Sequence, residues 1–223
     1  MTKKIEVAGD LRVANRLEAE AVRARLAQHG VLAVNLIGSP GCGKTAILES
    51  TIPMLGGLRS AVIEGDIATR RDADRIVAIG VTCVQINTGG GCHLLARQVS
   101  QVLDEIDLAA LDVLFVENVG NLVCPSTTDL GEDHKIALLS LPEGDDKVAK
   151  YPRLFREASC VLLNKADLAG VLAFSVERVR QDVAAIKADL PIFEVSARSG
   201  LGMDAWVAWL RNAREAKAAL PRK

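Results

Sequence analysis

The sequence predicts a doubly wound α/β domain built on a mainly parallel sheet. Short apolar runs rich in β-branched residues alternate along the chain with longer amphipathic segments. Such runs are typical of strands buried on both faces, because helices cover both faces of a parallel sheet. Ligands of these folds bind beyond the carboxyl ends of the strands. We therefore expect the loops that follow the strands to carry the function.

Seven strands and six helices are expected. The strands are the segments 31–38 (VLAVNLIG), 60–66 (SAVIEGD), 81–87 (VTCVQIN), 111–120 (LDVLFVENVG), 135–141 (KIALLSL), 159–165 (SCVLLNK) and 191–197 (PIFEVSA). The helices are expected over residues 11–28, 44–54, 72–79, 93–103, 176–189 and 203–217. Because the first helix precedes the first core strand, we interpret residues 1–30 as a helical extension of a single domain that spans residues 1–223.

Composition and charge exclude several kinds of partner. The chain has 223 residues, 49% of them hydrophobic, so it can bury a core without disulfides. Its formal net charge is −1, and its lysines and arginines are scattered, so we expect neither nucleic acid nor a membrane as a partner. The charged amino terminus does not resemble a signal peptide, and no apolar run reaches the ~18 residues of a membrane span. We expect a cytoplasmic protein, whose five cysteines bind metal, act in catalysis or are simply buried.

The segment "GSPGCGKT" predicts a phosphate-binding loop. It fits the pattern G-x-x-x-x-G-K-[ST] and lies between an apolar strand and a predicted helix, which makes a chance match in a tight turn a poor alternative. Backbone N–H groups of such a loop surround nucleotide phosphates. We expect Lys44 to contact the β- and γ-phosphates and the Thr45 hydroxyl to bind Mg²⁺. The expected nucleotide contacts in this region are Gly38, Ser39, Pro40, Gly41, Cys42, Gly43, Lys44, Thr45 and Ala46.

Two later segments predict that the base is guanine. "NKAD", from Asn164 to Asp167, and "SAR", residues 196–198, each follow an apolar strand, and both resemble the base-recognition loops of GTP-binding proteins. In that pattern the Asp167 carboxylate accepts two hydrogen bonds from guanine, and Lys165 lies along the base. Adenine lacks the matching donors, and an unpaired buried carboxylate costs about 1–3 kcal/mol. A solvated turn is the alternative for NKAD alone. The expected base contacts are Asn164, Lys165, Asp167, Ser196, Ala197 and Arg198.

Acidic residues between these segments are candidates for Mg²⁺ binding and for sensing the γ-phosphate. Asp66 ends a predicted strand, and Asp72 lies at a predicted helix start, where an N-cap is the alternative role. Glu117 and Gly120 lie at the end of another strand, so the carboxylate can reach the metal while the glycine N–H faces the terminal phosphate. We expect this segment to act as a nucleotide-dependent switch.

A second metal site is suggested by "TGGGCHL" and "NLVCP". Cys92 and His93 are expected at a strand-to-helix junction, and Cys124 follows Gly120 by four residues. Thiolates and imidazole are ligands that suit Zn²⁺ or Ni²⁺. One protomer offers three such ligands, so a closed site needs water or a second protomer. The alternative is that both cysteines are small buried side chains and that His93 merely begins a helix.

Six ordered segments of the chain together resemble a known family. They are "GSPGCGKT", "EGDIATRRDADRI", "TGGGCHL", "ENVGNLVCP", "EGDDKVAKYP" and "NKADL". From about Asn15 to Leu210 the chain is similar to the HypB-type hydrogenase nickel incorporation GTPases, in the dimer-forming branch of phosphate-loop GTPases. The resemblance implies a GTP-hydrolysing metallochaperone that delivers nickel to the large subunit of [NiFe] hydrogenase, with a HypA-type zinc protein as partner. It also implies that Cys92, His93 and Cys124 bind the metal at the interface of a GTP-dependent homodimer.

The resemblance has one gap and leads to one mechanistic hypothesis. Some relatives carry an amino-terminal Cys-x-x-Cys-Gly-Cys site or a His-rich tract, and "MTKKIEVAGDL" has neither, so we expect no tight nickel storage there. Because Glu117, Gly120 and Cys124 share one loop, we expect nucleotide state and metal affinity to be linked. Turnover is expected to be slow, since neither an arginine finger nor a water-orienting glutamine is evident beside Gly120.

Three alternative functions remain open from the sequence. A urease-type nickel GTPase shares the architecture but is expected to have Cys-Pro-His where this chain has Gly91-Cys92-His93. A GTPase chaperone of a cobalamin enzyme needs no cysteine and histidine cluster. A nucleotide-dependent binding module lacks useful hydrolysis.

Overall fold

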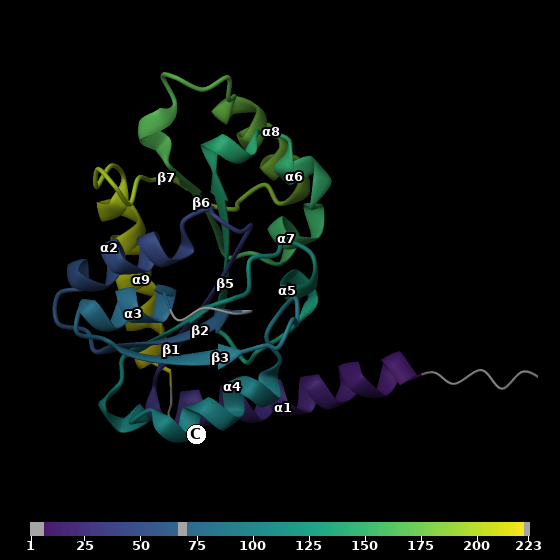
Figure 1. Cartoon of the computed structure of the whole chain (residues 1–223), viewed down its shortest axis with the longest axis vertical. Coiled ribbons are helices and arrows are strands. Elements are labelled where there is room, and N and C mark those ends of the chain that lie inside the picture. The colour runs from purple at the N-terminus through teal and green to yellow at the C-terminus, as the bar shows by residue number, and fades with distance from the viewer. Residues whose placement is uncertain (1–6, 67–70, 221–223) are drawn as a thin grey trace, which may run out of the picture.

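The computed structural model describes residues 7–66 and 71–220 of the chain (Figure 1). Its strands are β1 (Leu32–Gly38), β2 (Ser60–Asp66), β3 (Thr82–Asn87), β4 (Val113–Glu117), β5 (His134–Ser140), β6 (Cys160–Asn164) and β7 (Ile192–Glu194). Within the described residues they form one sheet in the order β3-β2-β4-β1-β5-β6-β7, and each neighbouring pair is parallel. The central strand β1 is buried along its whole length, as expected for its apolar sequence.

Helices connect the strands and cover the sheet on both faces. They are α1 (Val7–His29), α2 (Lys44–Met54), α3 (Arg71–Ala78), α4 (Ala96–Val102), α5 (Cys124–Thr127), α6 (Lys147–Lys150), α7 (Pro152–Glu157), α8 (Val176–Ile186) and α9 (Met203–Ala218). Among the described residues, no helix combines the length and the apolar character that crossing a membrane requires.

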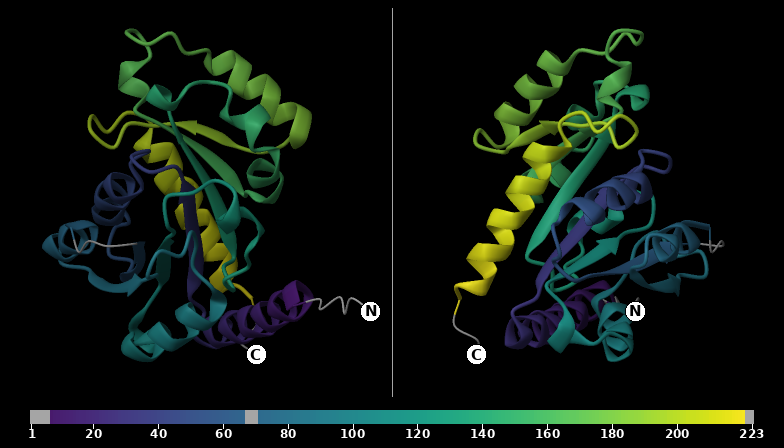
Figure 2. Two further views of the ribbon diagram at one scale, coloured as in Figure 1. Left: turned by 45° about the vertical axis from the view of Figure 1, so that its right-hand side comes forward. Right: turned by 90° about the vertical axis from the view of Figure 1, so that its left-hand side faces the viewer.

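Three clusters of buried side chains divide the core between the two faces. On one face α2, α3 and α9 pack against the middle of the sheet, with Trp206 of α9 fully buried. On the other face α1 and α4 cover the half that contains β2 and β4, and α1 and α4 lie side by side at the bottom of Figure 1. The helices α6 to α8 cover β5 and β6 on that same face. In Figure 2, α9 runs along the length of the sheet.

The sequence located every strand, and the fold class and the additional amino-terminal helix are confirmed. The predicted helix 93–103 was wrong at its start, because α4 begins at Ala96. Leu95 has an extended backbone (φ −114°, ψ 151°), its N–H donates to the Gln98 side chain, and the Leu94 N–H donates to Asn118 Oδ1. These hydrogen bonds keep residues 92–95 out of the helix. Three short helices, α5, α6 and α7, were not expected.

Candidate nucleotide and metal site

The phosphate loop joins the carboxyl end of β1 to the first residue of α2. Gly41 and Gly43 have positive φ angles of 75° and 98°, which glycine adopts without strain. A Cβ at Gly43 would lie 2.5 Å from Nδ2 of Asn164, so this glycine also allows the Asn164 amide to approach the loop. The backbone therefore curls tightly in front of the N-terminus of α2, as a phosphate-binding loop requires.

Cys42 fills the space behind this loop. Its side chain is fully buried, and a Cβ at Gly38 would lie 2.5 Å from the Cys42 sulfur. Burial raises the pKa of the Cys42 thiol to about 11, against an opposing effect of Lys44. The thiol is therefore neutral at physiological pH. Cys42 contributes packing to the loop, and its backbone carbonyl accepts a hydrogen bond from Asn164 (2.9 Å).

Lys44 and Thr45 lie buried at the start of α2. The Lys44 ammonium is 3.5 Å from the carbonyl oxygen of Ser39 within the same loop. The Thr45 hydroxyl donates to Oε1 of Glu117 at 2.9 Å. The hydroxyl and the carboxylate expected to share a hard cation are therefore already adjacent. Ala46, on the first turn of α2, is half-buried.

Glu117 is a buried acid with incomplete hydrogen bonding. Its side chain is 4% exposed, and within the described residues its Oε2 has no hydrogen-bond partner. Burial raises the pKa of Glu117 to about 7, although Lys44 and the Thr45 hydroxyl favour the charged form. A buried carboxylate oxygen without a partner is costly unless a ligand completes it. Together with the Thr45 hydroxyl, this oxygen fits the oxygen ligands that Mg²⁺ prefers.

The other predicted acids lie nearby at the same edge of the sheet. Asp66 is the last residue of β2 and is half-buried. Asp72 lies in the first turn of α3 and forms an ion pair with Arg75 (3.1 Å). Asp72 follows the first residue of that helix, so the alternative N-cap role does not describe its position. Residues 67–70, which join β2 to α3, lie outside the described part of the chain.

Glu64 is a buried acid that the sequence analysis missed. It pairs in register with Glu117 on the adjacent strand, so the two side chains point to the same face of the sheet. Glu64 is 2% exposed, and its Oε2 has no hydrogen-bond partner within the described residues. Burial, followed by the nearby charge of Glu117, raises the pKa of Glu64 to about 8. The available signal was a glutamate inside an otherwise apolar strand.

The two predicted base-recognition loops meet behind the phosphate loop. The Asn164 side chain donates to Cys42 O, and its Oδ1 accepts from the Ala197 N–H (3.3 Å). Lys165 has a left-handed backbone (φ 60°), and its ammonium donates to Gly41 O (2.8 Å). Asn164 therefore connects three segments that are distant in sequence.

The remaining predicted base contacts lie around this junction. Ser196 is buried, and its hydroxyl accepts a hydrogen bond from the Ser199 N–H (3.1 Å). Asp167 and Arg198 are exposed to solvent. The Asp167 carboxylate is thus accessible to a ligand beside Lys165.

Cys92, His93 and Cys124 come together at the same edge of the molecule. Their candidate ligand atoms all lie within 4.8 Å of one another, and the Cys92 sulfur is 3.3 Å from Nδ1 of His93. Cys92 is exposed and the other two are half-buried, so the alternative of simple burial does not describe them. Burial lowers the pKa of His93, and a hydrogen bond with Cys124 raises the pKa of Cys92. The three side chains could hold a metal ion that prefers sulfur and nitrogen ligands.

The loop after β4 connects this cluster to the phosphate loop. A Cβ at Gly120 would lie 2.8 Å from Cγ and 2.9 Å from the backbone N of Pro40. Only glycine allows the backbone to pass this close to the phosphate loop. The same loop reaches Cys124 four residues later, where α5 begins. A single short segment therefore contacts both candidate sites.

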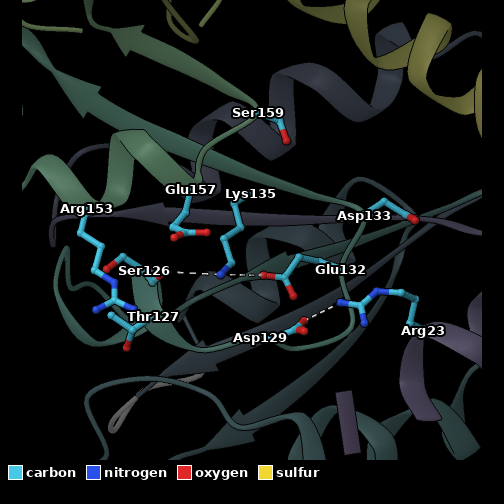
Figure 3. A pocket seen from close by; sticks show the side chains of 10 residues that line it. All are labelled: Arg23, Ser126, Thr127, Asp129, Glu132, Asp133, Lys135, Arg153, Glu157 and Ser159. Carbon is cyan, nitrogen blue, oxygen red and sulfur yellow. Dashed lines mark hydrogen bonds and ion pairs between the residues drawn. The ribbon is translucent and has the colours of Figure 1, made fainter. Parts of the chain in front are cut away.

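A polar pocket lies at the opposite end of the sheet (Figure 3). It has a volume of about 360 Å³. Arg23 is paired with Asp129 (2.7 Å), and the Lys135 ammonium is 3.7 Å from Glu132, as Figure 3 shows. His134, which had no role in the sequence analysis, begins β5 at this end and contacts the Trp209 ring at 5.0 Å between centroids. Two oppositely charged pairs of the pocket are therefore completed within it.

Comparison with known proteins gives consistent matches. Residues 32–194 match the sequence profile of the family described as "CobW/HypB/UreG, nucleotide-binding domain". The chain is 47% identical over 214 residues to "Hydrogenase maturation factor HypB" of Azotobacter vinelandii, covering 96% of this chain and 71% of that protein. It is 43% identical over 198 residues to "Hydrogenase/urease maturation factor HypB" of Helicobacter hepaticus, covering 87% and 81% of the two chains.

A solved structure gives the same match in three dimensions. The crystal structure of HypB from Helicobacter pylori in complex with nickel superimposes with a TM-score of 0.86 at 38% identity, covering 94% of this chain and 99% of that one. The parallel sheet, the loop before α2 and these matches define a phosphate-loop nucleotide-binding domain of the GTPase class. More narrowly, the chain belongs to the HypB family of hydrogenase maturation factors.

Proposed function

We propose that this hydrogenase maturation factor is a slow, Mg²⁺-dependent GTPase that carries nickel. We further propose that its nickel affinity differs between the GTP-bound and GDP-bound states. The observation that carries the proposal is the position of Cys124. Its sulfur lies within 4.8 Å of the ligand atoms of Cys92 and His93, and it belongs to the loop that passes Pro40 at Gly120. Chemistry at the phosphate loop can therefore move one of three metal ligands.

The phosphate loop and the nearby acids are proposed to bind the nucleotide phosphates. Backbone N–H groups of residues 38–46 surround them, and Lys44 turns from the Ser39 carbonyl toward the β- and γ-phosphates. We assign Mg²⁺ binding, directly or through water, to the Thr45 hydroxyl and to the carboxylates of Glu117, Asp66 and Asp72. The hydrogen bond between Thr45 and Glu117 supports this assignment for those two groups. The bound ion neutralises charge that develops on the phosphates during hydrolysis.

Guanine selection is assigned to the two loops that Asn164 joins. The exposed Asp167 carboxylate accepts from the donors on the guanine edge, while the Lys165 stem lies along the base. Ser196, Ala197 and Arg198 complete the base pocket. The hydrogen bonds of Asn164 to Cys42 and Ala197 support this assignment, because they fix the base loops against the phosphate loop.

Nickel is treated as the cargo of Cys92, His93 and Cys124. The nickel complex of the Helicobacter pylori relative supports nickel as the metal, and the ligand types also suit Zn²⁺. Three ligands leave a coordination position for water or for a second copy of the chain. We propose that GTP favours a homodimer that brings the two clusters together, and that a HypA-type protein and the hydrogenase large subunit are the partners. We also propose that residues 1–223 form a single domain.

The central experiment measures nickel binding and GTP turnover on matched variants. Cys92→Ala and Cys124→Ala are each expected to weaken nickel binding at least about tenfold, because even the loss of a residue that only supports a ligand typically costs about 10- to 100-fold in metal affinity. The half-buried Cys83 on β3 provides the control Cys83→Ala, which should bind nickel as the wild type does. Unchanged nickel binding in both ligand variants would remove the metal assignment.

Three further readouts test the alternative functions and the proposed dimer. If the wild-type protein releases no phosphate from GTP in the presence of Mg²⁺, the alternative of a nucleotide-dependent binding module without hydrolysis is favoured. Size-exclusion chromatography with GDP and with a non-hydrolysable GTP analogue tests the proposed dimer. The Helicobacter hepaticus relative is named as a maturation factor of both hydrogenase and urease. Activation of apo-urease as well as apo-hydrogenase by the nickel-loaded chain would extend the proposed function to both enzymes.

A further inference from the structure

Two asparagine side chains connect the loop after β4 to the loop that carries Cys92 and His93. They are Asn118 and Asn121, which lie on either side of Gly120 in the chain. Neither was assigned a role by the sequence analysis. The hydrogen bonds of Asn118 attach its loop to the core of the sheet, whereas those of Asn121 connect two loops at the surface.

Asn118 is a fixed point. It is 1% exposed, its backbone N–H donates to Leu36 O on β1 (3.1 Å), and its Nδ2 donates to Oδ1 of Asn35 (3.2 Å). Its Oδ1 accepts from the N–H groups of Leu94 (3.2 Å) and Val119 (3.0 Å). Asn35 in turn donates to Oε1 of Glu132 at 3.1 Å. Leu94, next to His93, is therefore attached to the core of the sheet.

Asn121 lies beyond this fixed point, on the part of the loop that contacts the phosphate loop. Its Nδ2 donates to the carbonyl oxygen of Cys92 at 3.1 Å, and its Oδ1 accepts from the Val123 N–H at 2.9 Å. It follows directly after Gly120, which touches Pro40, and precedes Cys124 by three residues. One half-buried side chain thus bridges the metal-ligand loop and the segment expected to respond to the γ-phosphate.

We propose that Asn121 is the positioning residue that couples the nucleotide site to the metal site. Its amide sets the position of the Cys124 segment relative to Cys92. When the nucleotide displaces Gly120, the Asn121 amide either shifts the Cys92 carbonyl or loses its hydrogen bond to it. Both outcomes change the separation of the ligand atoms. Removing the amide disconnects the two loops, while Asn118 continues to hold Leu94 in place.

This inference rests on the proposed function, since it requires that nickel affinity differ between nucleotide states. Such coupling between two sites is typically about 5- to 150-fold in affinity. The measured quantity is the ratio of nickel affinities in the presence of GDP and of a non-hydrolysable GTP analogue. The Asn121 side chain is expected to contact neither nickel nor the nucleotide. Its loss should therefore change the ratio of nickel affinities in the two nucleotide states more than it changes nickel affinity or nucleotide affinity alone.

Asn15 on α1 offers a matched control. It is also half-buried, its Nδ2 donates to Asp129 O (2.8 Å), and its Oδ1 accepts from the Ala96 N–H (3.0 Å). Asn15→Ala therefore removes the same two kinds of hydrogen bond near the start of α4, but its partner in the connection after β4 is Asp129, five residues beyond Cys124, and none of residues 121–124. Equal changes in melting temperature for Asn15→Ala and Asn121→Ala would show that the two substitutions perturb folding alike.

A second variant separates the two hydrogen bonds of Asn121. Asn121→Ser keeps a side-chain oxygen that can accept from the Val123 N–H, because serine forms turns of the same kind. Its hydroxyl is too short to reach Cys92 O in place of the amide. If the bond to Cys92 carries the coupling, Asn121→Ser behaves like Asn121→Ala.

The test is a set of nickel titrations on wild type, Asn121→Ala, Asn121→Ser and Asn15→Ala, each with GDP and with the GTP analogue. We expect the ratio of affinities to fall toward one in both Asn121 variants and to stay at the wild-type value in Asn15→Ala. A ratio preserved in either Asn121 variant, or lost equally in Asn15→Ala, overturns the inference. A wild-type ratio of one instead contradicts the proposed function, so the two failures are distinguishable.

Discussion

The two ends of the sheet differ in whether their buried or half-buried carboxylates are fully hydrogen-bonded. At the amino end, Asp112 accepts hydrogen bonds from Arg59 and Arg214, and Asp133 binds the ammonium of Lys217 at 2.6 Å. At the carboxyl end, three glutamates each keep one buried oxygen that has no hydrogen-bond partner in the described residues. They are Glu64, Glu117 and Glu143.

This difference separates stability from function. Paired charges at the amino end hold α9 and the loops to the sheet. Both oxygens of the Asp112 and Asp133 carboxylates accept hydrogen bonds, and the buried Nε of Arg214 is the atom at this end that has no partner in the described residues. Unpartnered carboxylates at the carboxyl end cost stability in the absence of ligand, and a cation or a proton can complete them. We therefore expect substitutions at the carboxyl end to affect binding and hydrolysis, and substitutions at the amino end to affect unfolding.

The largest effect is expected for Lys44→Ala. Loss of the phosphate-binding ammonium should reduce GTP turnover at least about 100-fold, the usual consequence of removing a preorganised charge from the transition state. The Lys44 ammonium makes one long hydrogen bond, at 3.5 Å to Ser39 O, and its charge also favours the ionised form of the buried Glu117, so we expect a loss of unfolding free energy that is small beside the loss of turnover. Phosphate-release assays and urea unfolding measure the two quantities. A large loss of unfolding free energy with normal GTP turnover would show that Lys44 serves stability and not function, which contradicts the proposed difference between the two ends.

Glu117→Gln should separate the two properties at a single residue. We expect GTP turnover to fall at least about tenfold, because a proposed Mg²⁺ ligand becomes neutral. The nucleotide-free variant should be as stable as wild type or more so at about pH 8, since a charged carboxylate is no longer buried. Thermal unfolding without ligand tests this expectation. A clear loss of stability would show that the Glu117 charge is satisfied in the free protein.

At the amino end, Asp112→Ala should do the opposite. Its carboxylate accepts from the backbone N–H and the Nε of Arg59 and from Arg214, which is 14% exposed. Leaving these donors without a partner should cost about 1–3 kcal/mol of unfolding free energy, with normal turnover per folded molecule. The exposed pair of Arg25 with Asp104 is the control, and Asp104→Ala should cost less than about 1 kcal/mol. Equal costs at both sites would contradict this interpretation.

The two ends should also respond to pH with opposite signs. The pKa of Glu64 rises on folding from 4.5 to about 8, so its stabilising effect is complete below 4.5 and is lost as the pH rises through 8. Burial alone would raise the pKa of Asp112, but hydrogen bonds from Arg59 and Arg214 lower it below 3.8, so its contribution is lost in acid. In nucleotide-free protein, Glu64→Gln should flatten the decline of unfolding free energy between about pH 5 and pH 8. An unchanged slope would indicate that Glu64 titrates normally.

The sequence was sufficient for the strands and for the loops at their ends. Continuous apolar runs identified each strand, and the glycine and lysine pattern identified the phosphate loop, because both signals are local. The grouping of Cys124 with Cys92 and His93 followed from the family resemblance, and the structure brings the three side chains together. Whether the individual site residues bind nucleotide and metal stays a prediction.

What the sequence did not reveal depends on contacts between distant segments. The late start of α4 reflects the hydrogen bond from Leu94 to Asn118, which no local pattern encodes. Glu64 is visible in the sequence as a glutamate inside a strand, but its place beside Glu117 depends on the register of β2 and β4, which no local pattern encodes. The short helices α5 to α7 are only four to six residues long, so they lack the periodicity that identifies a helix.

The most direct test of the coupling between nucleotide and metal is reciprocal. Affinities for GDP and for a non-hydrolysable GTP analogue are measured on the same protein, first without nickel and then with nickel at saturation. Linkage predicts that nickel changes the ratio of the two nucleotide affinities by the same factor by which the nucleotides change nickel affinity. If nickel leaves the ratio of the two nucleotide affinities unchanged, the account is contradicted. The coupling free energy between the nucleotide site and the metal site would then be zero, although the loop from Glu117 to Cys124 connects them.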